Sequence, residues 1–168
     1  MRTRALAPAH QDKPSRVRQR APVSTPSRGE ITVVVADDDE QVGPALAALL
    51  DQEPDFRVVG RVTNGDDALA VARDQRAALV ITDVRMPGGG PELVRRLVAL
   101  PHGPVVVGCS AQADSATWTR LLAAGGSAYL LKGRVAGELP ALLRRCMQGE
   151  LVVAVPGAPG VVRRLFSG

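Results

Sequence analysis

Side chains that could do chemistry stand directly after four apolar runs of the chain. They comprise several carboxylates, one hydroxyl and one ammonium: Asp37, Asp38 and Asp39 after ITVVVA, Asp83 after AALVIT, Ser110 after PVVVGC, and Lys132 after SAYLL. Neighbouring carboxylates repel, and each raises the cost of ionising the next. The run of three aspartates therefore indicates a place where a bound cation would offset that repulsion.

These residue types suit a hard divalent cation together with a phosphoryl group. Mg²⁺ prefers oxygen ligands and keeps several waters, so one or two carboxylates and a phosphate complete its shell. The carboxylate of Asp83 could attack phosphorus and form an aspartyl phosphate. The Ser110 hydroxyl could donate a hydrogen bond to a phosphoryl oxygen, and the Lys132 ammonium could neutralise it as a point charge.

Each of these residues also has a simpler interpretation. Asp39 is equally well explained as the cap of a following helix. Taken singly, Ser110 is typical of a turn, Lys132 of solvated surface and Tyr129 of core packing. The arrangement of polar residues at successive strand ends, in chain order, favours the chemical interpretation over these separate ones.

The elements that would position these residues are visible in the hydrophobic pattern. Predicted strands at 31–36, 56–61, 77–82, 104–109 and 127–131 alternate with predicted helices at about 42–53, 65–75, 90–100, 112–124 and 135–148. Strands that are apolar throughout are typical of a parallel sheet buried on both faces. Five such repeats with short connections predict right-handed crossovers and a doubly wound α/β sandwich. Ligands bind beyond the carboxyl ends of the strands in such sheets.

Composition excludes several classes of protein. No apolar run of this 168-residue chain approaches the ~20 residues of a membrane helix, so membrane insertion is not expected. The basic N-terminus is followed by no apolar stretch, so it does not read as a secretory signal. The two cysteines, Cys109 and Cys146, form neither a disulfide framework nor a metal-type spacing. These features fit a soluble protein of the reducing cytoplasm, and the bias toward Arg, Ala, Gly and Val suggests a bacterial source.

The net charge of +4 is unevenly distributed. Residues 1–29 hold seven Lys or Arg and one Asp (+6), residues 30–150 hold twelve Lys or Arg and sixteen acids (−4), and residues 151–168 hold two Arg (+2). The predicted folded body is thus acidic. A DNA-binding domain usually carries its own basic face, so no direct DNA binding is expected from this body.

The two ends of the chain differ from its body. Residues 1–29 have four prolines and no periodic apolar pattern, and we predict a disordered basic tail. This tail is either a basic arm that contacts nucleic acid, an acidic partner or anionic lipid, or an inert leader. Residues 30–149 form the predicted domain, and residues 150–168 a C-terminal tail or linker remnant. The alternative for that last segment is a docking peptide with an apolar patch at Val161, Val162, Leu165 and Phe166.

From about Ile31 to Gln148 the sequence resembles the receiver domain of two-component response regulators. The marks are Asp37-Asp38 after the first strand, the run DVRMPG from Asp83, Ser110-Ala111 after the fourth strand, and AGGSAYLLK ending at Lys132. Thr63 to Leu69 also looks like the start of the second helix in that family. The resemblance implies a flavodoxin-like (βα)5 fold with a parallel five-stranded sheet of order 2-1-3-4-5.

The resemblance also implies roles for the candidate residues. Asp83 would accept a phosphoryl group from a histidine kinase. Asp37, Asp38, Asp83 and the backbone carbonyl of Arg85 would hold Mg²⁺. Lys132 would contact the phosphoryl group, and Ser110 and Tyr129 would form the switch pair that changes contacts with a downstream protein.

Some positions depart from the general family pattern. Gly133 follows the lysine where many receivers have proline, and DVRMPG looks like the NarL/LuxR-type subfamily, which often lacks that proline. Asp39 stands where that subfamily often has histidine. The segment 149–168 resembles the linker to a helix-turn-helix domain, and no further DNA-reading helices follow it in this sequence.

The leading hypothesis is thus a phosphorylatable receiver, a signalling module rather than an enzyme. A second is a receiver fold that no longer takes phosphate and only binds partners. A third is a phosphatase of the haloacid dehalogenase type, whose D-x-D motif Asp37 and Asp39 would satisfy with Asp37 as nucleophile. That class needs a late acidic pair, whereas the acids after Asp83 are isolated. The sequence leaves open whether two copies form a homodimer.

Overall fold

The computed structural model describes residues 29–133 and 137–155. Strands and helices alternate along this part of the chain: β1 (Ile31–Ala36), α1 (Val42–Leu50), β2 (Phe56–Val62), α2 (Gly65–Asp74), β3 (Leu79–Asp83), α3 (Pro91–Val98), β4 (Val105–Ser110), α4 (Ser115–Ala123), β5 (Ala128–Leu131), α5 (Leu139–Met147) and β6 (Val152–Ala154). All five predicted strands and all five predicted helices are present. Each helix ends one to three residues before its predicted end, because cap and turn residues follow it.

The strands form one parallel sheet of order β2-β1-β3-β4-β5-β6. The predicted α/β class and the order 2-1-3-4-5 are confirmed, but the prediction of a five-stranded sheet was wrong by one strand. Residues Val152–Ala154, assigned to a C-terminal tail, pair with β5 as a sixth strand. Gly149, with φ of 88°, turns the chain after α5 and allows this return. Three residues are too few for a readable strand pattern.

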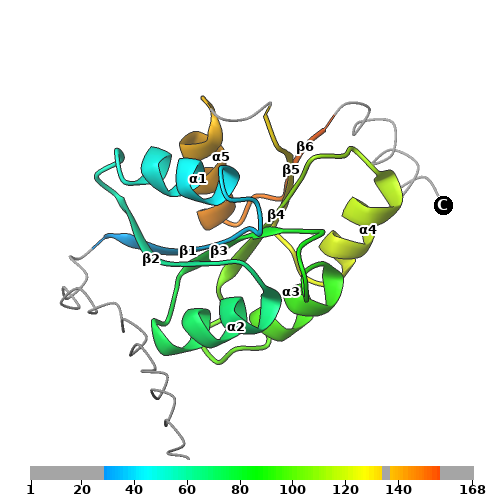
Figure 1. The fold of residues 1–168 in the computed structure, drawn as a ribbon, viewed down its shortest axis with the longest axis horizontal. Coiled ribbons are helices and arrows are strands. Elements are labelled where there is room, and N and C mark those ends of the chain that lie inside the picture. The colour runs from blue at the N-terminus through cyan, green and yellow to red at the C-terminus, as the bar shows by residue number, and fades with distance from the viewer. Residues whose placement is uncertain (1–28, 134–136, 156–168) are drawn as a thin grey trace, which may run out of the picture.

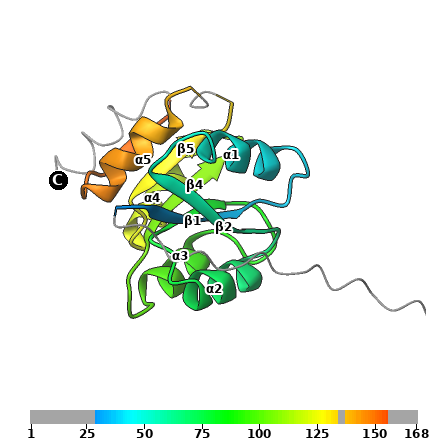
Figure 2. The ribbon, with the colours of Figure 1, turned by 90° about the vertical axis from the view of Figure 1, so that its left-hand side faces the viewer.

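Helices cover both faces of the sheet (Figures 1 and 2). Helices α1 and α5 lie on one face, and α2, α3 and α4 lie on the other. Two apolar clusters fill the spaces between helices and sheet, and both are largely aliphatic. Because the inner strands are covered on both faces, the buried polar side chains lie at or near the strand ends.

Polar side chains cap the first turns of two helices, α2 and α4. The Asn64 side chain accepts a hydrogen bond from the Asp67 amide at 2.9 Å and caps α2. Asp114 likewise accepts from the amides of Ala116 and Thr117 and caps α4. Among the described residues, no helix combines the length and apolar character that crossing a bilayer requires. The predicted basic tail and the residues around Val161 lie outside the described part of the chain.

Candidate functional site

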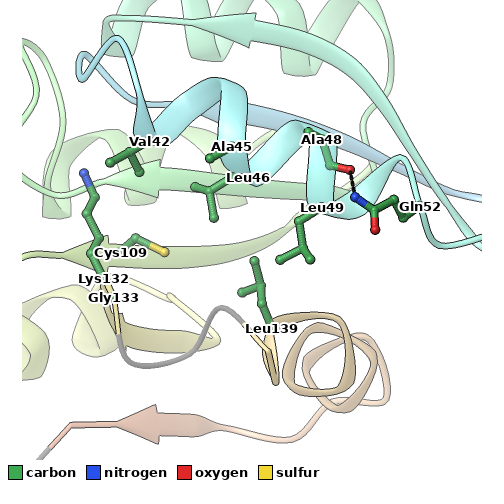
Figure 3. A pocket seen from close by; sticks show the side chains of 10 residues that line it. All are labelled: Val42, Ala45, Leu46, Ala48, Leu49, Gln52, Cys109, Lys132, Gly133 and Leu139. Atoms are coloured by element: carbon green, nitrogen blue, oxygen red, sulfur yellow. Dashed lines mark hydrogen bonds between the residues drawn. The ribbon is translucent and has the colours of Figure 1, made fainter.

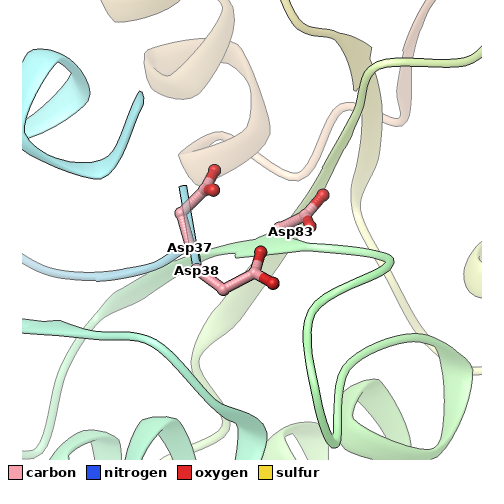
Figure 4. Close-up of side chains that lie close together, drawn as sticks. All are labelled: Asp37, Asp38 and Asp83. Atoms are coloured by element: carbon pink, nitrogen blue, oxygen red, sulfur yellow. The ribbon is translucent and has the colours of Figure 1, made fainter. Parts of the chain in front are cut away.

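Two neighbouring strands bring three carboxylates together at the carboxyl edge of the sheet. Asp37 and Asp38 follow β1, and Asp83 ends β3, which pairs with β1. One carboxylate oxygen from each of the three lies within 4.8 Å of the others (Figure 4). Asp37 and Asp83 are buried while Asp38 is exposed. The cluster is therefore closed on the side of the sheet and open to a ligand on the side of Asp38.

A fourth charged group, the Lys132 ammonium, reaches the cluster from the end of β5. Lys132 Nζ lies 2.7 Å from Asp37 Oδ2 and 3.2 Å from Asp83 Oδ1. The Lys132 amide donates to the Ser110 carbonyl at 2.8 Å, which extends the β4–β5 pairing to this residue. Burial works against the charge of Lys132, but the nearby carboxylates of Asp37 and Asp83 outweigh it and raise the Lys132 pKa above its ordinary value.

The donor atoms of this cluster fit a hard divalent cation. Three carboxylates face one ammonium, so acidic groups outnumber basic ones. Asp37 Oδ2 is buried and has no hydrogen-bond partner of good geometry, so the nearby Lys132 charge is what balances it. A buried carboxylate oxygen without a donor costs free energy unless a cation meets it. Carboxylate oxygens are the ligands that Mg²⁺ prefers.

The third aspartate of the triplet, Asp39, has different contacts from those of Asp37 and Asp38. Asp39 Oδ1 accepts hydrogen bonds from the Gln41 and Val42 amides at 2.8 and 3.1 Å, at the start of α1. These backbone hydrogen bonds lower the Asp39 pKa. Asp39 is absent from the group of carboxylates that approach one another. Of its two sequence interpretations, the geometry therefore favours the helix cap.

Ser110 and Tyr129 are connected through one residue, Gln112. Ser110 Oγ accepts a hydrogen bond from the Gln112 amide at 3.2 Å, and the Tyr129 hydroxyl donates to the Gln112 carbonyl at 2.9 Å. Both Ser110 and Tyr129 are buried. Burial raises the Tyr129 pKa, partly offset by the Ser110 hydroxyl. The predicted switch pair thus lies in one continuous contact path, with the aromatic ring turned inward.

A comparison with protein families decides what kind of domain this is. The model of the response regulator receiver domain matches residues 33–144. The chain belongs to this family. The match contains the acidic residues after β1, the end of β3 and the ends of β4 and β5.

Curated relatives and solved structures agree with this assignment. The chain is 31% identical over 137 residues to the response regulator GacA of Pseudomonas protegens, covering 81% of this chain and 64% of that protein. It is 30% identical over 138 residues to the transcriptional regulatory protein DesR of Bacillus subtilis, covering 82% and 66%. The chain thus spans just under two thirds of the length of these relatives.

Two solved structures show the same fold. A two-component response regulator of the LuxR family from Aurantimonas sp. SI85-9A1 matches with a TM-score of 0.74 and 20% identity, covering 81% of this chain and 98% of that one. The non-phosphorylated receiver domain of RcsB from Escherichia coli matches with a TM-score of 0.67 and 22% identity, covering 75% and 99%.

In this receiver, the loop after Asp83 carries Arg85, whose side chain is exposed. The loop folds back under the strand end, with the Gly89 amide donating to the Met86 carbonyl at 2.9 Å. A Cβ on Gly89 would lie 2.7 Å from the Asp83 carbonyl, so glycine is required there. This packing determines the path of the backbone that carries the Arg85 carbonyl.

The start of α2 supports the same loop, a contact that the sequence interpretation missed. The Gly65 amide donates to the Pro87 carbonyl at 2.8 Å. A Cβ on Gly65 would lie 1.9 Å from the Gly88 carbonyl oxygen, so this approach also depends on glycine. The segment from Thr63 to Leu69 was identified as a helix start, but nothing local in it indicates which loop it would contact.

An apolar groove of about 540 Å³ runs beside the site, between α1 and the first residue of α5 (Figure 3). Its wall consists of Val42, Ala45, Leu46, Ala48, Leu49, Gln52, Cys109, Lys132, Gly133 and Leu139. Burial raises the pKa of the Cys109 thiol to about 12, so this side chain is a neutral wall residue. Gln112 and Cys109 are two site neighbours that the sequence interpretation did not single out.

Proposed function

We propose that this chain is a phosphorylatable receiver that takes a phosphoryl group on Asp83 from a histidine kinase and then changes its protein contacts. The observation that carries the proposal is the approach of three carboxylates to within 4.8 Å, with the Lys132 ammonium 3.2 Å from Asp83. A helix cap or a turn explains one such residue, but not four that converge from three strand ends.

In the proposed transfer, a carboxylate oxygen of Asp83 attacks the phosphorus of a phosphohistidine. A P–O bond forms as the P–N bond breaks, and the electron pair leaves with the imidazole of the kinase. Asp37, Asp38, Asp83 and the Arg85 carbonyl would hold Mg²⁺, which supplies positive charge to the phosphoryl oxygens when bound. Lys132, 3.2 Å from Asp83 Oδ1, is within reach of an oxygen on the new phosphoryl group.

The proposed output is a change of packing on the side of α4 and β5. A phosphoryl oxygen on Asp83 would attract the Ser110 hydroxyl, whose Oγ now accepts from the Gln112 amide. Because the Tyr129 hydroxyl donates to the same residue, a change at Ser110 reaches the ring. Such a local event can bias two conformations of the surface that a partner contacts.

On this proposal the chain acts in the bacterial cytoplasm as a signalling module rather than as an enzyme. Its partners would be a histidine kinase and a downstream protein, without direct DNA binding by the receiver. The buried free cysteines Cys109 and Cys146 are consistent with a reducing compartment.

Incubation with Mg²⁺ and acetyl phosphate, followed by intact-mass measurement, tests the proposal. The expected result is one acid-stable, base-labile phosphoryl group that requires Mg²⁺ and is abolished by Asp83→Asn. Asp114→Asn is a matched control because Asp114 lies outside the cluster and caps α4.

Two results would contradict this reading. If Asp37→Asn abolishes labelling while Asp83→Asn retains it, Asp37 is the nucleophile and a phosphatase mechanism replaces the receiver mechanism. If the wild-type chain gains no mass while a known receiver in the same reaction does, the module binds its partners independently of phosphate.

A further inference from the structure

Strand β6 lies at the edge of the sheet, directly beside Tyr129. In the parallel β5–β6 pair, Tyr129 is opposite Val153. Directly opposed residues of neighbouring strands present their side chains on the same face of a sheet. Tyr129 and Val153 accordingly contribute to the same apolar cluster, on the face covered by α4.

The Tyr129 ring is fully buried although β5 would be the edge strand without β6. Val153 and Val155 are partly buried and pack against the cluster that contains Tyr129 and the α4 residue Trp118. These valines occupy the space at the open side of β5. Val153, opposite Tyr129 in the register, and Val155 thus lie on the sheet face that carries the ring.

The opposite end of Tyr129 is connected to the phosphoacceptor side of the fold. Its hydroxyl donates to the Gln112 carbonyl, and the Gln112 amide donates to Ser110 Oγ. Ser110 ends β4, one residue after Cys109, which is paired with Asp83. One contact path therefore runs from the end of β3 to the side chains of β6.

Strand β6 is short and lies at the sheet edge, so its attachment can respond to such a path. It has three residues, and its first amide, at Val152, donates to the Ser127 carbonyl at 3.0 Å. The turn before it is held by an ion pair of 2.8 Å between the half-exposed Arg145 and Glu150. Segments with few buried contacts open at a small fraction of the global free energy of unfolding. A ligand can shift an equilibrium of that size.

We propose that β6 is a reporter strand whose pairing with β5 is strengthened when Asp83 is phosphorylated. The inference rests on the proposed function. Capture of the Ser110 hydroxyl by the phosphoryl group holds Tyr129 in its inward position, and the inward ring is the surface on which Val153 and Val155 pack. The state of Asp83 is thereby transmitted to the sheet edge at β6.

Hydrogen exchange of the full chain tests this coupling. Amide exchange in peptides covering residues 150–155 is compared with and without Mg²⁺ and beryllium fluoride, a phosphoryl mimic. We expect exchange to slow by roughly fivefold or more, the lower end of couplings between distinct sites. Peptides covering the end of α2, which packs on β1 and β2 near the opposite edge of the sheet, should change much less.

Coupling between two equilibria is reciprocal, so a variant that weakens the β5–β6 pairing should also bind beryllium fluoride more weakly. Val153→Ala removes side-chain atoms that pack beside Tyr129, and we expect it to raise the apparent Kd for beryllium fluoride roughly fivefold. Leu151→Ala is the matched control, because Leu151 precedes the strand and is 61% exposed. It should leave that Kd unchanged.

Each outcome supports or contradicts the proposed coupling. Slower amide exchange in β6, together with weaker binding of beryllium fluoride by Val153→Ala, supports it. If the mimic binds and Asp83 gains a phosphoryl mass, but β6 exchange stays the same or accelerates, the coupling is wrong and the receiver function stands. If the wild-type chain neither binds the mimic nor gains mass, the proposed function fails and the coupling fails with it.

Discussion

At the scale of single residues, three consecutive aspartates have three different environments. Asp37 is buried and lies 2.7 Å from Lys132 Nζ, Asp38 is exposed at the open side of the cluster, and Asp39 caps α1. Their order along the chain explains this, because successive side chains leaving a strand point in different directions. Adjacent, chemically identical residues can therefore be separated by experiment.

The first prediction compares Asp38→Asn with Asp39→Asn. Asp38→Asn should lower the affinity for Mg²⁺ at least about tenfold, a loss that even an outer partner of a metal ligand produces. Its urea midpoint should not fall, because a repulsive carboxylate is removed. Asp39→Asn should keep most of the affinity, since the asparagine side chain can still cap the helix.

Asp39→Ala completes the comparison, because alanine cannot accept the two amide hydrogen bonds at the start of α1. It should lower the urea midpoint without the tenfold loss of Mg²⁺ affinity. Isothermal titration with MgCl₂ and urea unfolding measure the two effects. Equal losses of affinity in the Asp38 and Asp39 variants would show that the triplet acts as one ligand group.

At the scale of elements, the site depends on how closely the start of α2 approaches the loop between β3 and α3. The approach leaves no room for a side chain, as the 1.9 Å between a Cβ on Gly65 and the Gly88 carbonyl oxygen shows. The loop in turn folds against the Asp83 carbonyl through Gly89. An element outside the carboxylate cluster thus supports the loop that follows Asp83.

The second prediction is that Gly65→Ala destabilises the fold by about 1–3 kcal/mol, the range typical of overpacking. The displaced loop should also slow phosphorylation of Asp83 by acetyl phosphate. Gly137→Ala is the matched control, because a Cβ there meets nothing within 4 Å. Urea unfolding and the rate of mass gain check the two effects, and a Gly65→Ala variant with wild-type values in both would refute the packing argument.

At the scale of the whole molecule, α5 is joined to the segment after α1 by a charge network on the helix-covered face opposite α2. Arg144 contacts Asp55 Oδ1 and Glu53 Oε2, each at 2.6 Å, and its guanidinium lies 5.3 Å from the centre of the Phe56 ring. These residues are far apart in the sequence. The network therefore links the first and last repeats of the sandwich.

The third prediction concerns the pH dependence of this link. The Arg144 hydrogen bond holds the Asp55 pKa below its ordinary value of 3.8. A depressed carboxyl pKa contributes stability that is present above the ordinary value and is lost as the pH falls through the folded-state value. The wild-type protein should be more stable than Asp55→Asn by a small amount at pH 7, as is typical of partly exposed ion pairs. This difference in stability should disappear below pH 3.8.

Urea unfolding at pH 7 and at acidic pH measures this difference. Asp51→Asn removes the same charge from an exposed residue that makes no ion pair among the described residues. The difference in stability between wild type and Asp51→Asn should not disappear at acidic pH as it does for Asp55→Asn. A gap for Asp55→Asn that stays constant with pH would show that the ion pair contributes nothing.

Much of this architecture was predictable because its signals are local. Apolar runs and the polar residues that end them lie within a few residues of each other, and parallel strands bring their carboxyl ends to one edge. Asp37, Asp38, Asp83 and Lys132 could therefore be placed together before any distance was known. The structure brings them within contact range.

The supports of the site were not predictable, because they join segments that are distant along the chain. Nothing near Gly65 indicates that it contacts Gly88, and nothing near Val153 indicates that it pairs with Tyr129. A three-residue strand has no period to read, and a glycine reveals its role only when another backbone lies against it.

The sequence by itself thus determined the fold class, the strand order implied by family resemblance and the types of residue at the site's edge. The tertiary structure alone decided that Asp39 caps a helix, that Gln112 connects Ser110 to Tyr129, and that a sixth strand covers the edge beside that ring. The physical reason is that hydrophobic periodicity and chain order are properties of neighbours in sequence. Hydrogen-bond partners and close backbone approaches depend on how separate elements pack.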